Sequence, residues 1–421
     1  MALLSTTRRC PYCAEEIKLG DCPIVATNFP EAEFLPDENF KASQVKLPSR
    51  TRPDKTLKTG WPIVAEAPAK RSKEGNKKRS WGFSSFGGSS SLPPLFEDAA
   101  REDLPARSCP SCELPLPQSI DERPALVIGV VGVNRVGKTH LLASCLTEAS
   151  KQRGLARIGC RDFSLDESTA QRFREKYYEP LFRQGEVLEM SLADAEAEKV
   201  RFRPLVFNAT LPNLGRVSLI LHDVAGEIMA DPRRRAIGAS YLRGAEGIIF
   251  VIDPREIDSL RGSLPQWILQ SNQVGFDQGA LLSACLRPDG IVDRDEVIPI
   301  AIAIGKADLL PQATGKSLPF LSPAPAQEDP PSFVERIRAT SRQVADFLEE
   351  QQAYDILDPA RAYGQTARSS ARNGNGQVTF HAFSALGSAP DSEDNLSEEV
   401  KPLNCIDPLA TVLAQVQMSA R

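Results

Sequence analysis

An eight-residue stretch, Gly132 to Thr139, constrains this chain more than any other feature. It matches the phosphate-binding loop G-x-x-x-x-G-K-[ST] at every fixed position. In such a loop backbone N–H groups wrap the phosphates, Lys138 reaches the outer phosphates, and the Thr139 hydroxyl ligates Mg²⁺. The apolar run Ala125 to Val131 before it predicts a buried parallel strand, and an apolar helix face follows it. Strand, loop and helix therefore occur in the order that phosphate binding requires.

Most residues of this stretch are expected to contact a bound nucleotide. The helix that follows the loop points its dipole and its free N–H groups at the anion. The residues that we expect to line the nucleotide are Gly132, Asn134, Arg135, Val136, Gly137, Lys138, Thr139 and His140. The ring of His140 is interpreted as a packed neighbour rather than a catalyst, and His222 is interpreted in the same way.

The composition suits one large core with an appended module, because the chain has 421 residues, of which 41% are hydrophobic and 25% charged. Its longest apolar runs have strand length and fall short of the ~20 residues of a membrane helix, so no membrane span is expected. The basic residues near the N-terminus follow a very short apolar stretch, the wrong order for a secretory signal. A cytoplasmic location is the resulting expectation.

Two Cys-Pro-x-Cys pairs indicate a metal site. Cys10 and Cys13 form one pair, and Cys109 and Cys112 form the other. Four thiolates in two such pairs match the ligands of a structural, tetrahedral Zn²⁺. The pairs stand 96 positions apart, but closing this long loop costs only about 1.6 kcal/mol more than closing a usual one. Since structural zinc contributes roughly 10–16 kcal/mol, the metal outweighs that cost.

Other interpretations of the cysteines remain open. The two pairs could be unrelated, or one of them could be a redox dithiol. Cys22 is a spare candidate ligand, although a plain thiol is the preferred interpretation. The nine cysteines as a whole favour thiols and a metal over a disulfide framework.

The segment between the two pairs, residues 41–104, is predicted to be a disordered insertion. It has few periodic apolar positions, and it contains a basic run from Lys70 to Arg79 and a Ser- and Gly-rich run from Ser84 to Ser91. The basic run could contact nucleic acid or anionic lipid. A solvated tether is the preferred interpretation.

Six stretches have the pattern of strands: 125–131, 203–210, 217–222, 247–252, 297–304 and 377–383. Helical patterns lie between them. One predicted helix begins with a capping box at Ser164 to Glu167 and carries Phe173, Tyr177 and Leu181 at fourfold spacing.

The third of these strands ends in a second phosphate-related motif. Asp223 follows the apolar run directly, and Gly226 completes D-x-x-G. Asp223 would hold Mg²⁺ through water, and the N–H of Gly226 would sense the outer phosphate. A switch loop before the strand pair should supply one more hydroxyl to Mg²⁺, and Ser191 is the only hydroxyl in that window.

These motifs together resemble the Ras-like, translation-factor-related (TRAFAC) GTPases. The resemblance implies a guanine motif, Asn-Lys-x-Asp, and the chain has Gly305-Lys306-Ala307-Asp308, in which the Asn is replaced. In the family the Asp accepts two hydrogen bonds from guanine and the Lys stem packs on the base. That charge-assisted pair is worth about 1.5–3 kcal/mol, whereas the missing Asn contact costs about 1 kcal/mol, so guanine preference should persist. Ser384-Ala385-Leu386 resembles the Ser-Ala-x loop whose backbone meets guanine.

The resemblance implies an α/β P-loop GTPase fold, a three-layer sandwich of about six mostly parallel strands. A small N-terminal zinc-ribbon-like module, split by the disordered insertion, would precede it. The predicted boundaries are 1–40 for the first half of the module, 41–104 for the insertion, 105–120 for the second knuckle, and 121–421 for the Ras-like domain.

The predicted catalytic residues are Lys138, Gly226 and Glu227. Many Ras-like enzymes use a Gln after D-x-x-G to position water, and Glu227 stands there. A carboxylate brings negative charge near phosphate oxygens, so we expect slow intrinsic hydrolysis. One of Arg233 to Arg235 could act as an internal arginine finger, but a solvated charged face is preferred.

The cysteine pair that leads into the loop, with His-Asp-Val-Ala-Gly-Glu and Gly-Lys-Ala-Asp, resembles the bacterial double-GTPase group (second class). That resemblance implies GTP and GDP as ligands, Mg²⁺, structural Zn²⁺, and a protein partner, a second GTPase or a GTPase-activating protein, in a multi-gene conflict or signalling system. Two alternatives stay open: a nucleotide-binding scaffold with little hydrolysis whose zinc module and insertion recognise protein or nucleic acid, and an ATP-dependent P-loop enzyme, for which Asp308 has no use.

Overall fold

The structure is a computed structural model of the full chain. It describes residues 7–25, 63–65, 106–133, 135–151, 154–188, 204–223, 240–270, 277–287, 297–325, 327–370, 378–390, 396 and 399–419. Within these ranges, none of the helices is both long and apolar enough to cross a bilayer.

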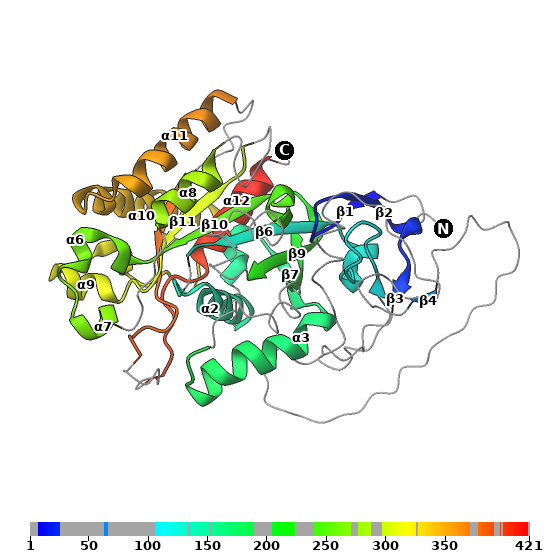
Figure 1. Ribbon diagram of the computed structural model, residues 1–421, viewed down its shortest axis with the longest axis horizontal. Coiled ribbons are helices and arrows are strands. Elements are labelled where there is room, and N and C mark those ends of the chain that lie inside the picture. The colour runs from blue at the N-terminus through cyan, green and yellow to red at the C-terminus, as the bar shows by residue number, and fades with distance from the viewer. Residues whose placement is uncertain are drawn as a thin grey trace, which may run out of the picture.

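A seven-stranded sheet forms the centre of the molecule (Figure 1). Its strands are, from one edge to the other, β12 (Val378–Ala382), β11 (Ile300–Ile304), β10 (Gly247–Ile252), β6 (Ala125–Val131), β9 (Gly215–Asp223), β8 (Leu205–Leu211) and β7 (Arg161–Leu165). Strand β8 runs in the direction opposite to the other six strands. The carboxyl ends of β6, β9, β10, β11 and β12 therefore meet at one edge of the sheet, where α/β proteins bind their ligands.

Helices cover both faces of this sheet. Figure 1 shows α8 (Gln278–Leu286) and α11 (Tyr354–Ser370) on one side and α2 (Lys138–Lys151) on the other. The central strands are buried on both faces, since every residue of β10 and β11 is buried. These features confirm the predicted three-layer α/β class.

The sheet has one strand more than the six expected, and this strand also corrects a helix boundary. Residues 161–165 form β7, so Ser164 of the predicted capping box lies in a strand and pairs with Asn208 of β8. The helix begins at Glu167 as α3 (Glu167–Phe173) and continues in two π-helical turns (Arg174–Tyr178 and Pro180–Gln184). The edge strand has a mostly exposed pattern, so it lacks the apolar signal by which the other strands were found.

The remaining helices complete the layers. They are α6 (Asp258–Arg261), α7 (Gln266–Gln270), α9 (Leu309–Thr314), α10 (Pro330–Glu350), α12 (Asp407–Ser419), and the 3₁₀ turns Gly154–Ile158, Ser240–Gly244, Pro254–Glu256 and Pro319–Leu321. The carboxylate of Asp329 caps α10 by accepting a 2.8 Å hydrogen bond from the Ser332 N–H.

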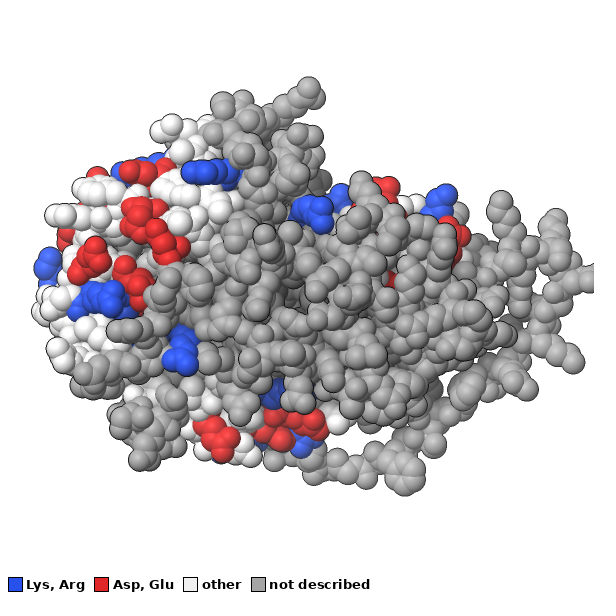
Figure 2. Space-filling view, in the orientation of Figure 1, with Lys and Arg blue, Asp and Glu red and all other residues white. Residues whose placement is uncertain are grey.

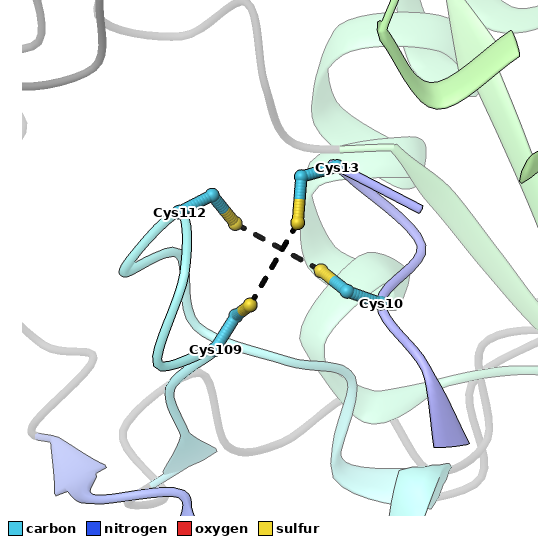
Figure 3. A group of neighbouring side chains, drawn as sticks. All are labelled: Cys10, Cys13, Cys109 and Cys112. Carbon is cyan, nitrogen blue, oxygen red and sulfur yellow. Dashed lines mark hydrogen bonds between the residues drawn. The ribbon is translucent and has the colours of Figure 1, made fainter. Parts of the chain in front are cut away.

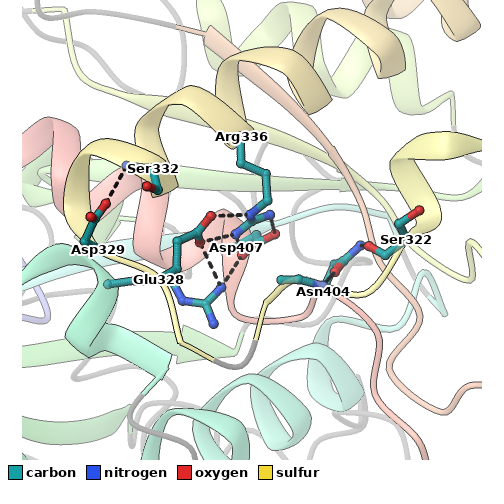
Figure 4. Close-up of polar contacts among 9 residues, drawn as sticks. Ser322, Glu328, Asp329, Ser332, Arg336, Asn404 and Asp407 are labelled. Carbon is teal, nitrogen blue, oxygen red and sulfur yellow. Dashed lines mark hydrogen bonds and ion pairs between the residues drawn. The ribbon is translucent and has the colours of Figure 1, made fainter.

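A buried ion network joins α10 to α12 (Figure 4). Arg336 donates to Asp407 at 2.6 Å and to Glu328 at 2.9 Å, and Arg157 donates to Asp407 at 3.1 Å. Both carboxylates are nearly inaccessible, at 3% and 4% side-chain exposure. Each buried carboxylate thus accepts hydrogen bonds from guanidinium groups, and the network links the two helices.

A separate small module precedes the sheet. Hairpin β1 (Thr7–Arg9) and β2 (Glu16–Lys18) lies beside a three-stranded sheet of β3 (Ile24–Val25), β4 (Ile63–Ala65) and β5 (Ala106–Arg107), with 3₁₀ turns at Leu19–Asp21 and Gln118–Asp121. Its own core contains four of the cysteines with Ile17, Leu19, Leu114, Leu116 and Ile120. Strand β4 is the part of the predicted insertion that the structure describes, and it pairs with β3.

Candidate nucleotide site and metal centre

The loop between β6 and α2 has a backbone that requires glycine. A Cβ added to Gly132 would lie 2.5 Å from the carbonyl oxygen of Val251, and Gly137 has a φ of +95°. Strand β6 ends at Val131 and α2 begins at Lys138, so the loop opens directly into a helix N-terminus. Strand, loop and helix thus follow one another as the sequence predicts.

The ammonium group of Lys138 lies inside this loop. It donates hydrogen bonds to the carbonyl oxygens of Gly132 at 3.0 Å and Val133 at 2.8 Å. The residue is only 5% exposed. A cation held against the loop backbone is placed to meet the oxygens of a phosphate seated in the loop.

The backbone at Gly305, where the guanine motif has Asn, leaves little room for a side chain. A Cβ at this position would lie 2.9 Å from the carbonyl oxygen of Val136 and 3.3 Å from the ring of Phe383. The N–H of Gly305 donates to the carbonyl of Ile252 at 2.9 Å. The end of β11 therefore lies directly against the phosphate loop, and a side chain there would force the two segments apart.

Lys306 ties three segments together. Its ammonium donates to the carbonyl oxygen of Arg135 in the loop and to Oδ2 of Asp253, both at 2.8 Å. Asp253 follows β10, is 1% exposed and also binds Arg255 at 2.7 Å. Burial alone would raise the pKa of Asp253, but Lys306 and Arg255 outweigh it and hold that pKa well below its usual range.

Asp253 was not among the predicted site residues. Its placement directly after a buried apolar run, like that of Asp223, was the available signal. Both residues lie at the edge of the sheet where the parallel strands end.

Asp308 and Ser384 meet although 76 positions separate them. The Ser384 hydroxyl donates to Oδ1 of Asp308 at 2.6 Å and accepts from the N–H of Gly387 at 2.9 Å. The Ser144 hydroxyl of α2 donates to the carbonyl of Ala385 at 2.8 Å. The residues of the two predicted guanine motifs therefore lie together, and the second is anchored to the helix that begins at the loop.

His140 is a packed residue in the structure. Its Nε2 accepts a 3.0 Å hydrogen bond from the N–H of Leu188, and burial lowers its pKa to about 4. The ring is therefore neutral at pH 7, with its proton on Nδ1.

The other predicted site residues are placed only in part. Asp223 ends β9 and pairs with Val130 in β6, two positions before Gly132. The remaining predicted positions lie outside the described residues: Asn134, Ser191, Gly226, Glu227 and Arg233 to Arg235.

The four predicted zinc ligands converge on one point (Figure 3). The sulfur atoms of Cys10, Cys13, Cys109 and Cys112 all lie within 4.8 Å of one another, and the pairs Cys10–Cys112 and Cys13–Cys109 are 3.8 Å apart. A tetrahedral Zn²⁺ with Zn–S bonds of about 2.3 Å separates its sulfurs by about 3.8 Å. The cluster therefore has the size that this ion requires.

The two cysteine knuckles, Cys10 to Cys13 (the first) and Cys109 to Cys112 (the second), have the same local geometry, which explains why their sulfurs converge. In the first, the Cys10 carbonyl accepts from the Ala14 N–H at 3.0 Å, and in the second, the Cys109 carbonyl accepts from the Glu113 N–H at 2.8 Å. Ala14 and Glu113 have left-handed φ angles of 63° and 61°. Each knuckle also directs one backbone N–H at the sulfur of its first cysteine. The geometry favours a shared metal over two unrelated pairs.

Cys22 stays outside the cluster. Its thiol donates to the Lys18 carbonyl at 3.4 Å, and burial raises its pKa to about 12. It is a plain thiol, as preferred above. All nine cysteines are free, which agrees with the expectation that no disulfide framework is present.

Hydrogen bonds from the neighbouring thiols, Cys10 first, hold the pKa of Cys109 well below its usual range.

The fold and the loop place this chain in a definite class: it has a GTPase-like fold. Residues 126–273 match the family model Double-GTPase 2. This match confirms, over those residues, the resemblance that the motifs predict.

Individual relatives are more distant. The chain is 26% identical over 197 residues to SaeC of Mycolicibacterium smegmatis, whose name assigns it provisionally to ESX-1 scaffolding and assembly. The match covers 46% of this chain and 50% of SaeC, so the chain spans about half the length of that relative.

The chain also has a distant similarity to the solved structures of a small GTPase and of a GTPase-like domain. The Arl6 BBS3 small GTPase of Trypanosoma brucei is 12% identical, covering 62% of this chain and 88% of its own, with a TM-score of 0.27. The Ski7 GTPase-like domain of S. cerevisiae is 14% identical, covering 65% and 47%, with a TM-score of 0.29.

Proposed function

We propose that this protein binds GTP and GDP with Mg²⁺ at the loop Gly132 to Thr139 and hydrolyses GTP slowly as a molecular switch. The observation that carries the proposal is the arrangement around Lys306. Its ammonium binds the loop backbone, while two positions further on Asp308 is held by Ser384 of the second guanine motif. A phosphate cradle and a guanine-reading carboxylate thus share one edge of the sheet.

The phosphate end of the site has these proposed roles. Lys138 binds the outer phosphates, and Thr139 and Asp223 hold Mg²⁺, with Ser191 as the further hydroxyl ligand. The N–H of Gly226 senses the outer phosphate, and Glu227 orients the attacking water. The buried position of Lys138 and the place of Asp223 beside β6 support these roles.

The base end of the site uses Asp308 for two charge-assisted hydrogen bonds to guanine. The hydroxyl bond from Ser384 fixes the carboxylate, and the backbone of Ser384 to Leu386 adds donors. Lys306 lies between loop and base. Position 305 lacks the Asn side chain of the guanine motif, and the backbone of Gly305 lies close to the loop instead.

The N-terminal module would be a structural zinc site formed by the two knuckles. Zinc would supply four Zn–S bonds that join chain segments far apart in sequence. The proposed organisation is a zinc-ribbon-like module in residues 1–40 and 105–120, an insertion in 41–104, and a nucleotide domain in 121–421. A cytoplasmic location is part of this proposal.

A protein partner, a second GTPase or a GTPase-activating protein, would accelerate hydrolysis in a bacterial conflict or signalling system. The match to Double-GTPase 2 supports a GTPase partner. Nucleic acid is a weaker candidate. On the face drawn in Figure 2, the acidic and basic side chains of the described residues are interspersed, without a continuous basic surface.

Competition binding tests the nucleotide assignment. A fluorescent GTP analogue bound to the protein with Mg²⁺ should be displaced by GTP and GDP but not by equimolar ATP. Equal displacement by ATP would support an ATP-dependent P-loop enzyme instead. Lys138→Ala should lose binding of all nucleotides, because the loop then lacks its cation.

A second candidate function is a nucleotide-binding scaffold with little or no hydrolysis, whose zinc module and insertion recognise protein or nucleic acid. Two observations support this candidate: the name of SaeC refers to scaffolding, and position 227 has a carboxylate where many Ras-like enzymes have Gln. Single-turnover GTP hydrolysis, with and without cell lysate, separates the two functions. A switch is accelerated by lysate, whereas a scaffold stays inactive. An unchanged rate in Glu227→Gln would remove Glu227 from the mechanism.

A further inference from the structure

His222 stands immediately before Asp223 and contacts the Cys10 to Cys13 segment of the zinc module. Its ring stacks on Tyr241 with centroids 4.0 Å apart and planes 17° apart, and it meets the edge of Tyr12 at 6.2 Å. Its Nε2 forms a 2.9 Å hydrogen bond with the carbonyl oxygen of Pro11, which lies between Cys10 and Cys13. The residue is 5% exposed.

The chemistry of this hydrogen bond is fixed by its surroundings. A carbonyl oxygen only accepts, so the proton must be on Nε2. The hydrogen bond to Pro11 and the stacking on Tyr241 together orient this buried ring.

The same knuckle also contacts the segment where the described chain resumes after Asp223. Tyr241 and Gly244 belong to the turn Ser240–Gly244. A Cβ on Gly244 would lie 2.8 Å from the Cβ of Ala14, so knuckle and turn are in close contact. Arg9 lies 4.0 Å from Glu246, whose other oxygen accepts from the Val127 N–H of β6 at 2.7 Å.

We propose that the first cysteine knuckle is a positioning element of the nucleotide site, which holds the end of β9 through His222 and responds in turn to the bound nucleotide. This inference rests on the proposed function, because it assigns Asp223 to Mg²⁺. The structural observation behind it is that one knuckle contacts both the residue before Asp223 and the turn Ser240–Gly244, where the described chain resumes after Asp223.

Magnesium-dependent nucleotide affinity measures this coupling in the full chain. The Kd of fluorescent GDP is measured once in the presence of Mg²⁺ and once in the presence of EDTA. The ratio of the Kd in EDTA to the Kd in Mg²⁺ is then compared between variants. His222→Phe keeps a ring on Tyr241 but removes the donor, so the ratio should fall about tenfold, the equivalent of one buried hydrogen bond. His222→Gln retains a donor and should recover most of the ratio.

Two controls separate positioning from a general loss of structure. Zinc content should be unchanged in both His222 variants. Arg9→Ala removes a longer, exposed contact of the same interface and should leave the ratio unchanged. A ratio in His222→Phe equal to that of the unmodified chain would overturn the inference.

Linkage supplies a second readout that a purely structural contact would not change. If the knuckle affects the nucleotide site, nucleotide must affect the knuckle by the same free energy. Amide exchange at Cys10 and Ala14 should therefore differ between GDP and a non-hydrolysable GTP analogue, and His222→Phe should abolish the difference. Equal exchange in the unmodified chain would overturn the coupling alone. Failure of the unmodified chain to bind guanine nucleotide would overturn the proposed function, and with it this inference.

Discussion

The ammonium of Lys306 and the carboxylate of Asp253 form a 2.8 Å ion pair beside the phosphate loop, with the carboxylate 1% exposed. The pair links the ends of β10 and β11, and the same ammonium binds the loop carbonyl of Arg135. Asp253 also accepts a hydrogen bond from the guanidinium group of Arg255. One buried carboxylate thus holds two cations at the base of the candidate site.

Asp253→Asn should therefore destabilise the protein by about 3 kcal/mol, because it leaves two cations without their buried counter-charge. Urea denaturation measures this effect. Since the folded-state pKa of Asp253 is depressed, its contribution is present above the unfolded pKa of about 4 and is lost as the pH falls below it. The difference in the free energy of unfolding between the unmodified chain and Asp253→Asn should therefore become smaller under those acidic conditions.

The matched control is the exposed pair of Lys316 and Glu350, whose side chains are 66% and 63% exposed. Lys316→Ala should change stability by less than about 1 kcal/mol, since surface pairs contribute little. A similar loss in both variants would show that the burial of Asp253 has no special effect.

The contribution of Glu148 to stability should depend on pH in the opposite direction. Burial first, and then the nearby Asp407, raise its pKa to about 7, and its Oε2 has no hydrogen-bond partner among the described residues. A raised carboxyl pKa means that the folded state binds the proton more tightly, so stability falls as the pH rises from about 4.5 to 7.

Glu148→Gln should accordingly stabilise the protein by about 2–3 kcal/mol above pH 7, with little gain near pH 4.5. Thermal unfolding across this range measures the difference. The exposed Glu350→Gln serves as the control and should show no such trend. A constant gain at all pH values would indicate that the charge of Glu148 is not responsible.

Restoring the family residue at position 305 should harm the site. Gly305→Asn places a Cβ 2.9 Å from the Val136 carbonyl, so we expect a loss of about 1–3 kcal/mol in stability and weaker nucleotide binding. Gly364→Ala, in α11 with open space around it, should be neutral or slightly stabilising. Tighter GTP binding by Gly305→Asn would refute the steric explanation.

The zinc assignment predicts that metal analysis finds zinc bound to the purified chain. Cys109→Ser should lose that zinc, because the cluster then offers only three thiolates. Cys22→Ser is the matched control, since this buried thiol lies in the same module but outside the cluster, and it should retain the metal. Zinc retained by Cys109→Ser would contradict a shared four-cysteine site.

The sequence allowed the sheet, the phosphate loop and the cysteine cluster to be predicted, because each has a strong local pattern. Buried strands are apolar runs, the loop has fixed glycines, and the paired cysteines have fixed spacing. Strand β7 was missed because an exposed edge strand carries no apolar pattern.

The contacts that complete the site could not be predicted. The bond of Ser384 to Asp308 and the ion pair of Lys306 with Asp253 join segments 76 and 53 positions apart. The close approach at Gly305 depends on how β11 packs against the loop, which no local pattern specifies.

The most direct test of the central claim is a change of base preference. Binding of GTP and xanthosine triphosphate is measured for the unmodified chain and for Asp308→Asn, whose neutral amide no longer suits guanine. We expect the unmodified chain to prefer GTP and Asp308→Asn to prefer the xanthosine nucleotide. Unchanged preference for GTP in Asp308→Asn would contradict the assignment of this carboxylate to guanine.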